Sequence, residues 1–86
     1  MDKLYIPVRV HINEDGKVTP EQIQAGYEGE WVTVEKVTDS RRRASLRVGA
    51  VGIRYTCVVN YNEERRNIYL FDECGKWWIE VEDFNA

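Results

Sequence analysis

Apolar and polar residues alternate along much of this chain with a period of two. The pattern runs through residues 6–12, 31–34, 53–59, 67–71 and 76–82. Because successive side chains of a β-strand point to opposite faces of the sheet, this alternation predicts half-buried strands. In the strand over 53–59, Cys57 has the apolar phase and is expected to point inward. In the strand over 76–82, Trp78 has the polar phase and is expected to be an exposed ring.

Turn-forming residues separate these runs. Residues 13–16 contain an Asp-Gly pair that suits positive φ, and residues 72–75 are expected to turn the chain before the last strand. Residues 60–66 are strongly polar and are expected to form a loop. Five to six short strands joined by such turns predict a mostly β protein, an antiparallel meander that curls into a partly closed barrel or roll. With 86 residues, the chain is expected to form a single domain over 1–86.

Two segments leave the local structure open. Thr19-Pro20-Glu21-Gln22 has the features of a helix start, with Thr19 as N-cap and Pro20 in the first turn. Gly26 and Gly29 leave room for only a short helix near 19–25, and a strand over 22–27 is the alternative. Val37 falls out of phase with the preceding valines, which predicts a β-bulge.

The charge along the chain is segregated. Residues 1–35 carry a net charge of −4, residues 36–66 a net charge of +5, and residues 67–86 a net charge of −4. The cationic third contains one lysine, Lys36, and seven arginines: Arg41, Arg42, Arg43, Arg47, Arg54, Arg65 and Arg66. The planar guanidinium group can bind a phosphate or a carboxylate through two hydrogen bonds. These arginines, with the ring of Trp78, are therefore the candidate binding residues.

Two interpretations of the cationic third remain open. Arg41–Arg43 in a loop-like stretch, Arg65 and Arg66 at a second loop and Arg54 between them would form an anion-binding surface if the fold brings them together. Beside an aromatic ring, such a surface suits single-stranded nucleic acid. The alternative is that acidic neighbours neutralise the arginines, within the chain or across a dimer. The overall charge of −3 and the pI of about 5.1 oppose tight DNA binding.

Catalytic and cofactor motifs are not evident in the sequence. His11 is the only histidine, so a catalytic dyad or triad of a nucleophile with a histidine would depend on it alone. Cys57 and Cys74 are too few for a zinc site with that histidine, and no metal or cofactor is expected. Glu80 and Glu82 alternate on one strand and could act as an acid–base pair, which is a third and weaker hypothesis. We expect a protein that is not an enzyme.

The N-terminus has no apolar run of signal-peptide length, and no stretch approaches the roughly 20 apolar residues of a membrane span. A cytoplasmic protein with two free thiols and no membrane partner is expected.

Several short motifs carry a resemblance to a known group of proteins. They are Arg43-Ala44-Ser45-Leu46-Arg47-Val48-Gly49, Gly52-Ile53-Arg54-Tyr55-Thr56, Tyr69-Leu70-Phe71 and Trp77-Trp78-Ile79-Glu80. The chain resembles a family of small uncharacterised bacterial proteins with these motifs. More distantly, through the segment from Trp31 to Val37, it resembles small β domains associated with Y-family (translesion) DNA polymerases. The resemblance implies an association with DNA repair and transfers no catalytic residue.

The leading hypothesis from the sequence is a non-enzymatic module that binds an anionic or protein partner through residues 36–66, with a role in nucleic-acid processing as one version. The alternative is a structural homodimer whose basic and acidic regions pair across a two-fold axis, with no nucleic-acid role.

Overall fold

The computed structural model describes residues 3–26, 28–44 and 51–80, and these residues form strands and no helix. The seven strands are β1 (Lys3–Tyr5), β2 (Val8–Ile12), β3 (Val18–Gln24), β4 (Trp31–Ala44), β5 (Val51–Tyr61), β6 (Glu64–Glu73) and β7 (Lys76–Glu80). All neighbours are antiparallel in one sheet of order β1-β7-β6-β5-β4-β3-β2. The prediction of a mostly β protein is confirmed, and the expected count of five to six strands is too low.

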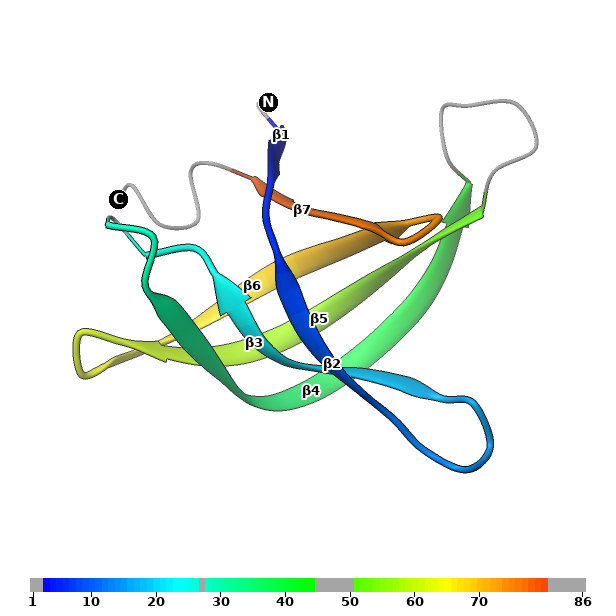
Figure 1. Cartoon of the computed structure of the whole chain (residues 1–86), viewed down its shortest axis with the longest axis horizontal. Helices are drawn as coiled ribbons and strands as arrows, with labels where there is room; N and C mark the ends of the chain where they lie inside the picture. The colour runs from blue at the N-terminus through cyan, green and yellow to red at the C-terminus, as the bar shows by residue number, and fades with distance from the viewer. Residues whose placement is uncertain (1–2, 27, 45–50, 81–86) are drawn as a thin grey trace.

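The sheet curls into a half-barrel, and the N-terminal segment reaches both of its edges (Figure 1). β1 pairs with β7, whereas β2, which follows two residues later, pairs with β3. At the crossing, the Ile6 amide donates to the Trp77 carbonyl at 3.0 Å, and the Pro7 carbonyl accepts from the Gln24 amide at 3.0 Å. Pro7 has no amide hydrogen to donate, which suits a position between two ladders.

The segment that could have started a helix is a strand. β3 covers residues 18–24, so the short helix near 19–25 is wrong and the strand alternative is correct in type. Pro20 lies opposite Val10, beside an irregularity in the register between Arg9 and Val10. A proline is tolerated in a sheet at such a bulge because the ladder is already interrupted there.

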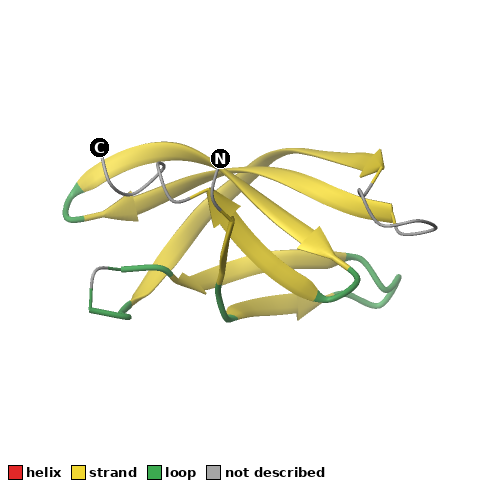
Figure 2. Ribbon diagram, turned by 90° about the horizontal axis from the view of Figure 1, so that it is seen from above, coloured by secondary structure: helices red, strands yellow, loops and turns green. Residues whose placement is uncertain are grey.

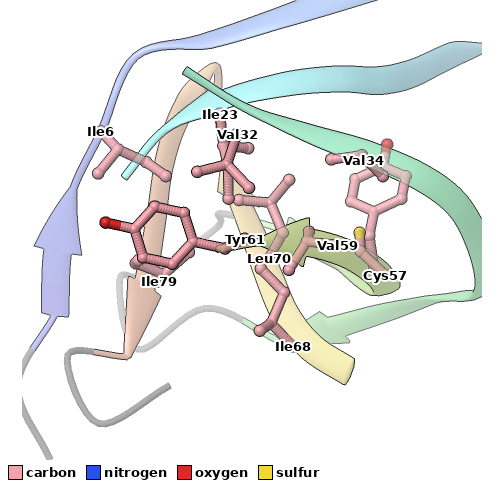
Figure 3. Close-up of a cluster of buried hydrophobic side chains, with 11 residues drawn as sticks. Ile6, Ile23, Val32, Val34, Cys57, Val59, Tyr61, Ile68, Leu70 and Ile79 are labelled. Atoms are coloured by element: carbon pink, nitrogen blue, oxygen red, sulfur yellow. The ribbon is translucent and has the colours of Figure 1, made fainter. Parts of the chain in front are cut away.

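The curled sheet is drawn as a ribbon in Figure 2. The main core lies on its concave, inner face (Figure 3). Its most buried members, at 0–1% exposure, are Ile23, Cys57, Val59, Leu70 and Ile79. They come from four different strands, so their burial requires the sheet to curl. The inward orientation expected for Cys57 is confirmed.

β4 and the turn after β5 differ from the sequence-based expectation. β4 has two irregularities, between Val34 and Lys36 and between Val37 and Asp39, which confirms the bulge at Val37. The strand then continues to Ala44, so the loop-like stretch expected around Arg41 is wrong.

The polar loop over 60–66 is also wrong. Only Asn62 and Glu63 separate β5 from β6, with φ of 53° and 65°. Two successive positive φ values match the twist of a tight hairpin, and asparagine tolerates that conformation. Arg65 and Arg66 therefore lie in β6. The turns expected at Gly16 and Gly75 are confirmed, with φ of 80° and 84°.

Candidate anion-binding site

The fold separates the candidate arginines into two groups at opposite ends of the β5 ladders. Arg41 and Arg54 lie directly opposite each other on β4 and β5, near the end of β4. Arg65 and Arg66 follow Glu64 in the first turn-proximal part of β6, beside the hairpin at the other end of β5. The backbone of Arg43 pairs with Gly52, whereas its side chain, like the whole of Arg47, lies outside the described part of the structure. The single arginine surface considered from the sequence is therefore not formed by these residues.

Acidic side chains of the same molecule bind three of these arginines. Arg65 Nε lies 3.0 Å from Glu35 Oε1, and Arg66 Nη2 lies 3.1 Å from Glu64 Oε2. Arg41 Nε lies 2.8 Å from Asp39 Oδ2. Within-chain neutralisation, one of the two interpretations left open by the sequence, thus occurs at these sites. Exposed ion pairs of this kind contribute only about 0–1 kcal/mol, so they do not prevent exchange with a stronger anionic ligand.

One cross-strand pair has an unfavourable charge arrangement. Three directly opposed pairs in the described ladders join two charged residues: Lys3 with Glu80, Glu73 with Lys76, and Arg41 with Arg54. The first two are of opposite sign, whereas the third places two cations face to face. Like charges directly opposite on neighbouring strands destabilise a sheet, on the scale of about 0.2–1 kcal/mol for cross-strand pairs. The Arg41–Arg54 pair is thus an arrangement that fold stability does not explain.

The surroundings of this pair leave it accessible on the outer face of the sheet. The Arg41 side chain is 70% exposed. The Arg54 guanidinium lies over the Tyr69 ring, 4.7 Å from its centroid, and Tyr69 is itself 43% exposed. We call Arg41, Arg54 and Tyr69 the arginine–tyrosine cluster. Arg42 is also exposed but faces Ile53, so it lies on the inner side of the same strand end.

Trp78 is not an exposed ring, so the exposure on which its choice as a binding residue rested is wrong. It is 7% exposed and stacks on Phe71, with ring centroids 3.9 Å apart and planes at 5°. Its indole N–H donates to Glu73 Oε1 at 2.9 Å, and Lys3 Nζ lies 4.6 Å from the ring centroid. The outer face of the sheet thus has a buried aromatic pair of its own. The polar phase of Trp78 predicted the correct face of the sheet but the wrong exposure.

Sequence reasoning missed Tyr69 and the opposition of Arg41 to Arg54. Tyr69 alternates with buried Leu70, so the period of two could have placed it on the outer face. The pairing of the two arginines depends on the register of β4 against β5. Two bulges set that register, and their number could not be read from the sequence.

Two of the clefts lined by described residues have no member of the arginine–tyrosine cluster in their linings. The larger, about 710 Å³, borders the N-terminal crossing and is lined by Tyr5, Pro7, Val8 and Trp77 among others. The smaller, about 330 Å³, separates the start of β3 from β4 and includes Thr19 and Ser40 in its lining. Tyr55 also lines this smaller cleft, and its burial together with the charge of Asp72 raises the pKa of its hydroxyl.

The described residues offer little catalytic or metal chemistry. Within them, no group of three or more His, Cys, Asp or Glu side chains could hold a metal ion. Burial raises the pKa of the Cys57 thiol to about 12, and Cys57 and Cys74 are both free. Glu80 lies opposite Lys3, whereas Glu82 lies outside the described residues.

No helix in the described ranges has the length and apolar character of a membrane span. Comparisons with family models, with curated proteins and with solved structures give no match for this chain.

Proposed function

We propose that this protein is a cytoplasmic, non-enzymatic binding module that recognises an anionic segment of a partner protein at the arginine–tyrosine cluster. The observation that carries the proposal is the face-to-face placement of Arg41 and Arg54. A carboxylate between the two guanidinium groups would replace a repulsion by charge-assisted hydrogen bonds, which are among the stronger polar interactions in proteins. The free energy lost in the unbound sheet is then recovered on binding.

Charge and composition favour a protein partner over a nucleic acid. The whole chain has a net charge of −3, so its long-range field repels a polyanion such as DNA. Tyrosine and arginine, by contrast, are enriched at protein–protein interfaces and among the residues that dominate their binding energy.

The test is a titration of the full chain with three fluorescent probes: a capped hexaglutamate peptide, single-stranded oligo-dT and duplex DNA, each over a salt series. We expect the peptide to bind with a dissociation constant below about 1 mM at low salt and more weakly as salt rises. Arg41→Glu should weaken binding at least about tenfold, which corresponds to roughly 1.4 kcal/mol.

Arg65→Glu is a closely matched control. The Arg65 side chain is 74% exposed and forms an ion pair at 3.0 Å, against 70% and 2.8 Å for Arg41. Both variants change the net charge equally, but Arg65 lies opposite Asn60 rather than opposite a second arginine. Equal losses in both variants would reduce the interaction to general charge attraction and refute a site at the cluster. Binding of oligo-dT with loss only in Arg41→Glu would replace the protein partner by a nucleic acid.

A further inference from the structure

Over most of its length, the edge of β4 that faces away from β5 has no neighbouring strand among the described residues. β4 has 14 residues, but only its first three, Trp31–Thr33, pair with β3. From Val34 to Ala44 it pairs, among the described residues, with β5 alone. Beyond this point β3 and β4 diverge, and clefts of about 480 Å³ and 330 Å³ lie between them. Half of the backbone amides and carbonyls along this edge therefore point away from the sheet.

The last part of this edge has the geometry that an added strand requires. Both bulges of β4 precede Asp39, and from Asp39 to Ala44 the strand keeps a regular register with β5. Six residues correspond to about 20 Å of strand, which is the usual length of a strand in globular proteins. An extended peptide can bind such an edge through its main chain, by the strand addition known from several peptide-recognition domains.

The side chains of this edge specify the charge of the peptide. Arg41 projects to the outer face and Arg42 to the inner face, so both sides of an added strand would meet a guanidinium group. Lys17 lines the inner cleft between β3 and β4 together with Ser40. An added strand with acidic residues at consecutive positions would place one carboxylate on each face, opposite a cation.

One antiparallel register with a second copy of this chain is unfavourable. If two β4 strands paired about a two-fold axis at Arg42, then Arg42 would face its own copy. Such like-charge opposition costs free energy. The charge of Arg42 thus disfavours this register of self-pairing, whereas it suits an acidic strand.

We infer that an acidic, extended segment of a partner protein binds along Asp39–Ala44 of β4 and adds an eighth strand to the sheet. This inference rests on the proposed function, because the same Arg41 supplies part of the anion recognition, and it adds the backbone geometry of the complex. The partner is defined by its chemistry: an unfolded or loop segment with β-forming residues and carboxylates on both faces.

The experiment uses the ¹⁵N-labelled full chain and two synthetic capped peptides of eight residues, composed only of glutamate and threonine in the same order. One peptide is unmodified, and the other is N-methylated at alternate residues on the side that would face β4. N-methylation keeps the carboxylates but removes the main-chain donors, so it separates strand addition from charge attraction.

We expect the unmodified peptide to shift the amide signals of residues 39–44 and to slow their hydrogen exchange, and the methylated peptide to bind at least about tenfold more weakly. Equal affinity of the two peptides, with binding that still requires Arg41, would overturn strand addition and leave the proposed function standing. Absence of binding by both peptides at about 1 mM in low salt would overturn both proposals. Shifts confined to the outer face around Tyr69 would also refute an added strand.

Discussion

The repulsion between Arg41 and Arg54 can be measured by a double-mutant cycle. The variants are Arg41→Thr, Arg54→Thr and the double variant, in which threonine keeps a high β-propensity. Each single variant also loses an interaction that does not involve the other arginine. Arg41→Thr loses the ion pair with Asp39, and Arg54→Thr loses the cation–π contact with Tyr69. These losses occur equally in the double variant, so the cycle isolates the term between the two arginines.

The expected magnitude follows from the geometry of the pair. Side chains directly opposed on antiparallel strands have Cβ atoms about 5 Å apart, and two unit charges at about 4 Å in water repel by roughly 1 kcal/mol. Asp39 draws the Arg41 guanidinium along β4, whereas the Arg54 guanidinium lies over the ring of Tyr69 on β6. We therefore expect an unfavourable coupling of about 0.3–0.5 kcal/mol, with the double variant less stable than the sum of the single effects.

Urea unfolding followed by tryptophan fluorescence measures this coupling. With a slope near 1 kcal/mol per molar urea, the coupling corresponds to roughly 0.3–0.5 M in combined midpoint shifts. At about 1 M salt, where the Debye length is near 3 Å, the coupling should fall to about 0.1 kcal/mol. A coupling that is zero or favourable at low salt would show that the two guanidinium groups do not repel each other, and the argument for an anion-binding site would lose its basis.

Three further predictions concern the core, the dependence of stability on acidic pH, and the thiols. Leu70→Ala, at a fully buried position, should lower the free energy of unfolding by about 2–5 kcal/mol in urea titrations, and a loss below about 1 kcal/mol would contradict the assigned core. The Tyr61 hydroxyl donates to Glu30 Oε1 at 2.7 Å and lowers the pKa of Glu30 below its ordinary 4.5. The stability from this bond is therefore present above pH 4.5 and is lost as the pH falls through the lowered pKa of the folded state. Tyr61→Phe should therefore reduce the fall in the free energy of unfolding between neutral and acidic pH. A fall as steep as that of the wild type would refute the assignment. Because burial raises the pKa of the Cys57 thiol to about 12, a thiol reagent near pH 8 should modify only exposed Cys74 in the folded protein and both cysteines after unfolding, and rapid labelling of two thiols would contradict this burial.

The alternation of residue types predicted the strands well because one face of the sheet carries the main core. It could not predict the burial of Trp78, since a period of two distinguishes the two faces of a strand but does not show whether the second face is covered by other side chains. Phe71 lies directly opposite Trp78 on the neighbouring strand, and the two rings bury each other. That cross-strand opposition depends on register, which is a property of the assembled sheet.

The candidate site was predicted only in part for the same reason. The arginine count and the cationic third were visible, but the sequence could not assign Arg41 to the same strand end as Arg54 and Arg65 to the opposite end. The expected polar loop over 60–66 also misplaced Arg65, because hydrophilic composition alone does not distinguish a loop from exposed strands. A hairpin needs only two residues with suitable φ, and Asn62 with Glu63 supply them.

The N-terminal crossing has a consequence for the way the molecule opens. Because residues 3–12 hydrogen-bond to β7 at one edge and to β3 at the other, release of this single segment uncovers both edges in one event. Amides of β7 and β3 that bond to this segment should therefore exchange with deuterium at a common rate, although their strands lie far apart in the sheet order. The ladder between β1 and β7 joins opposite ends of the described chain, so its closure is expected to be a late and slow step of folding.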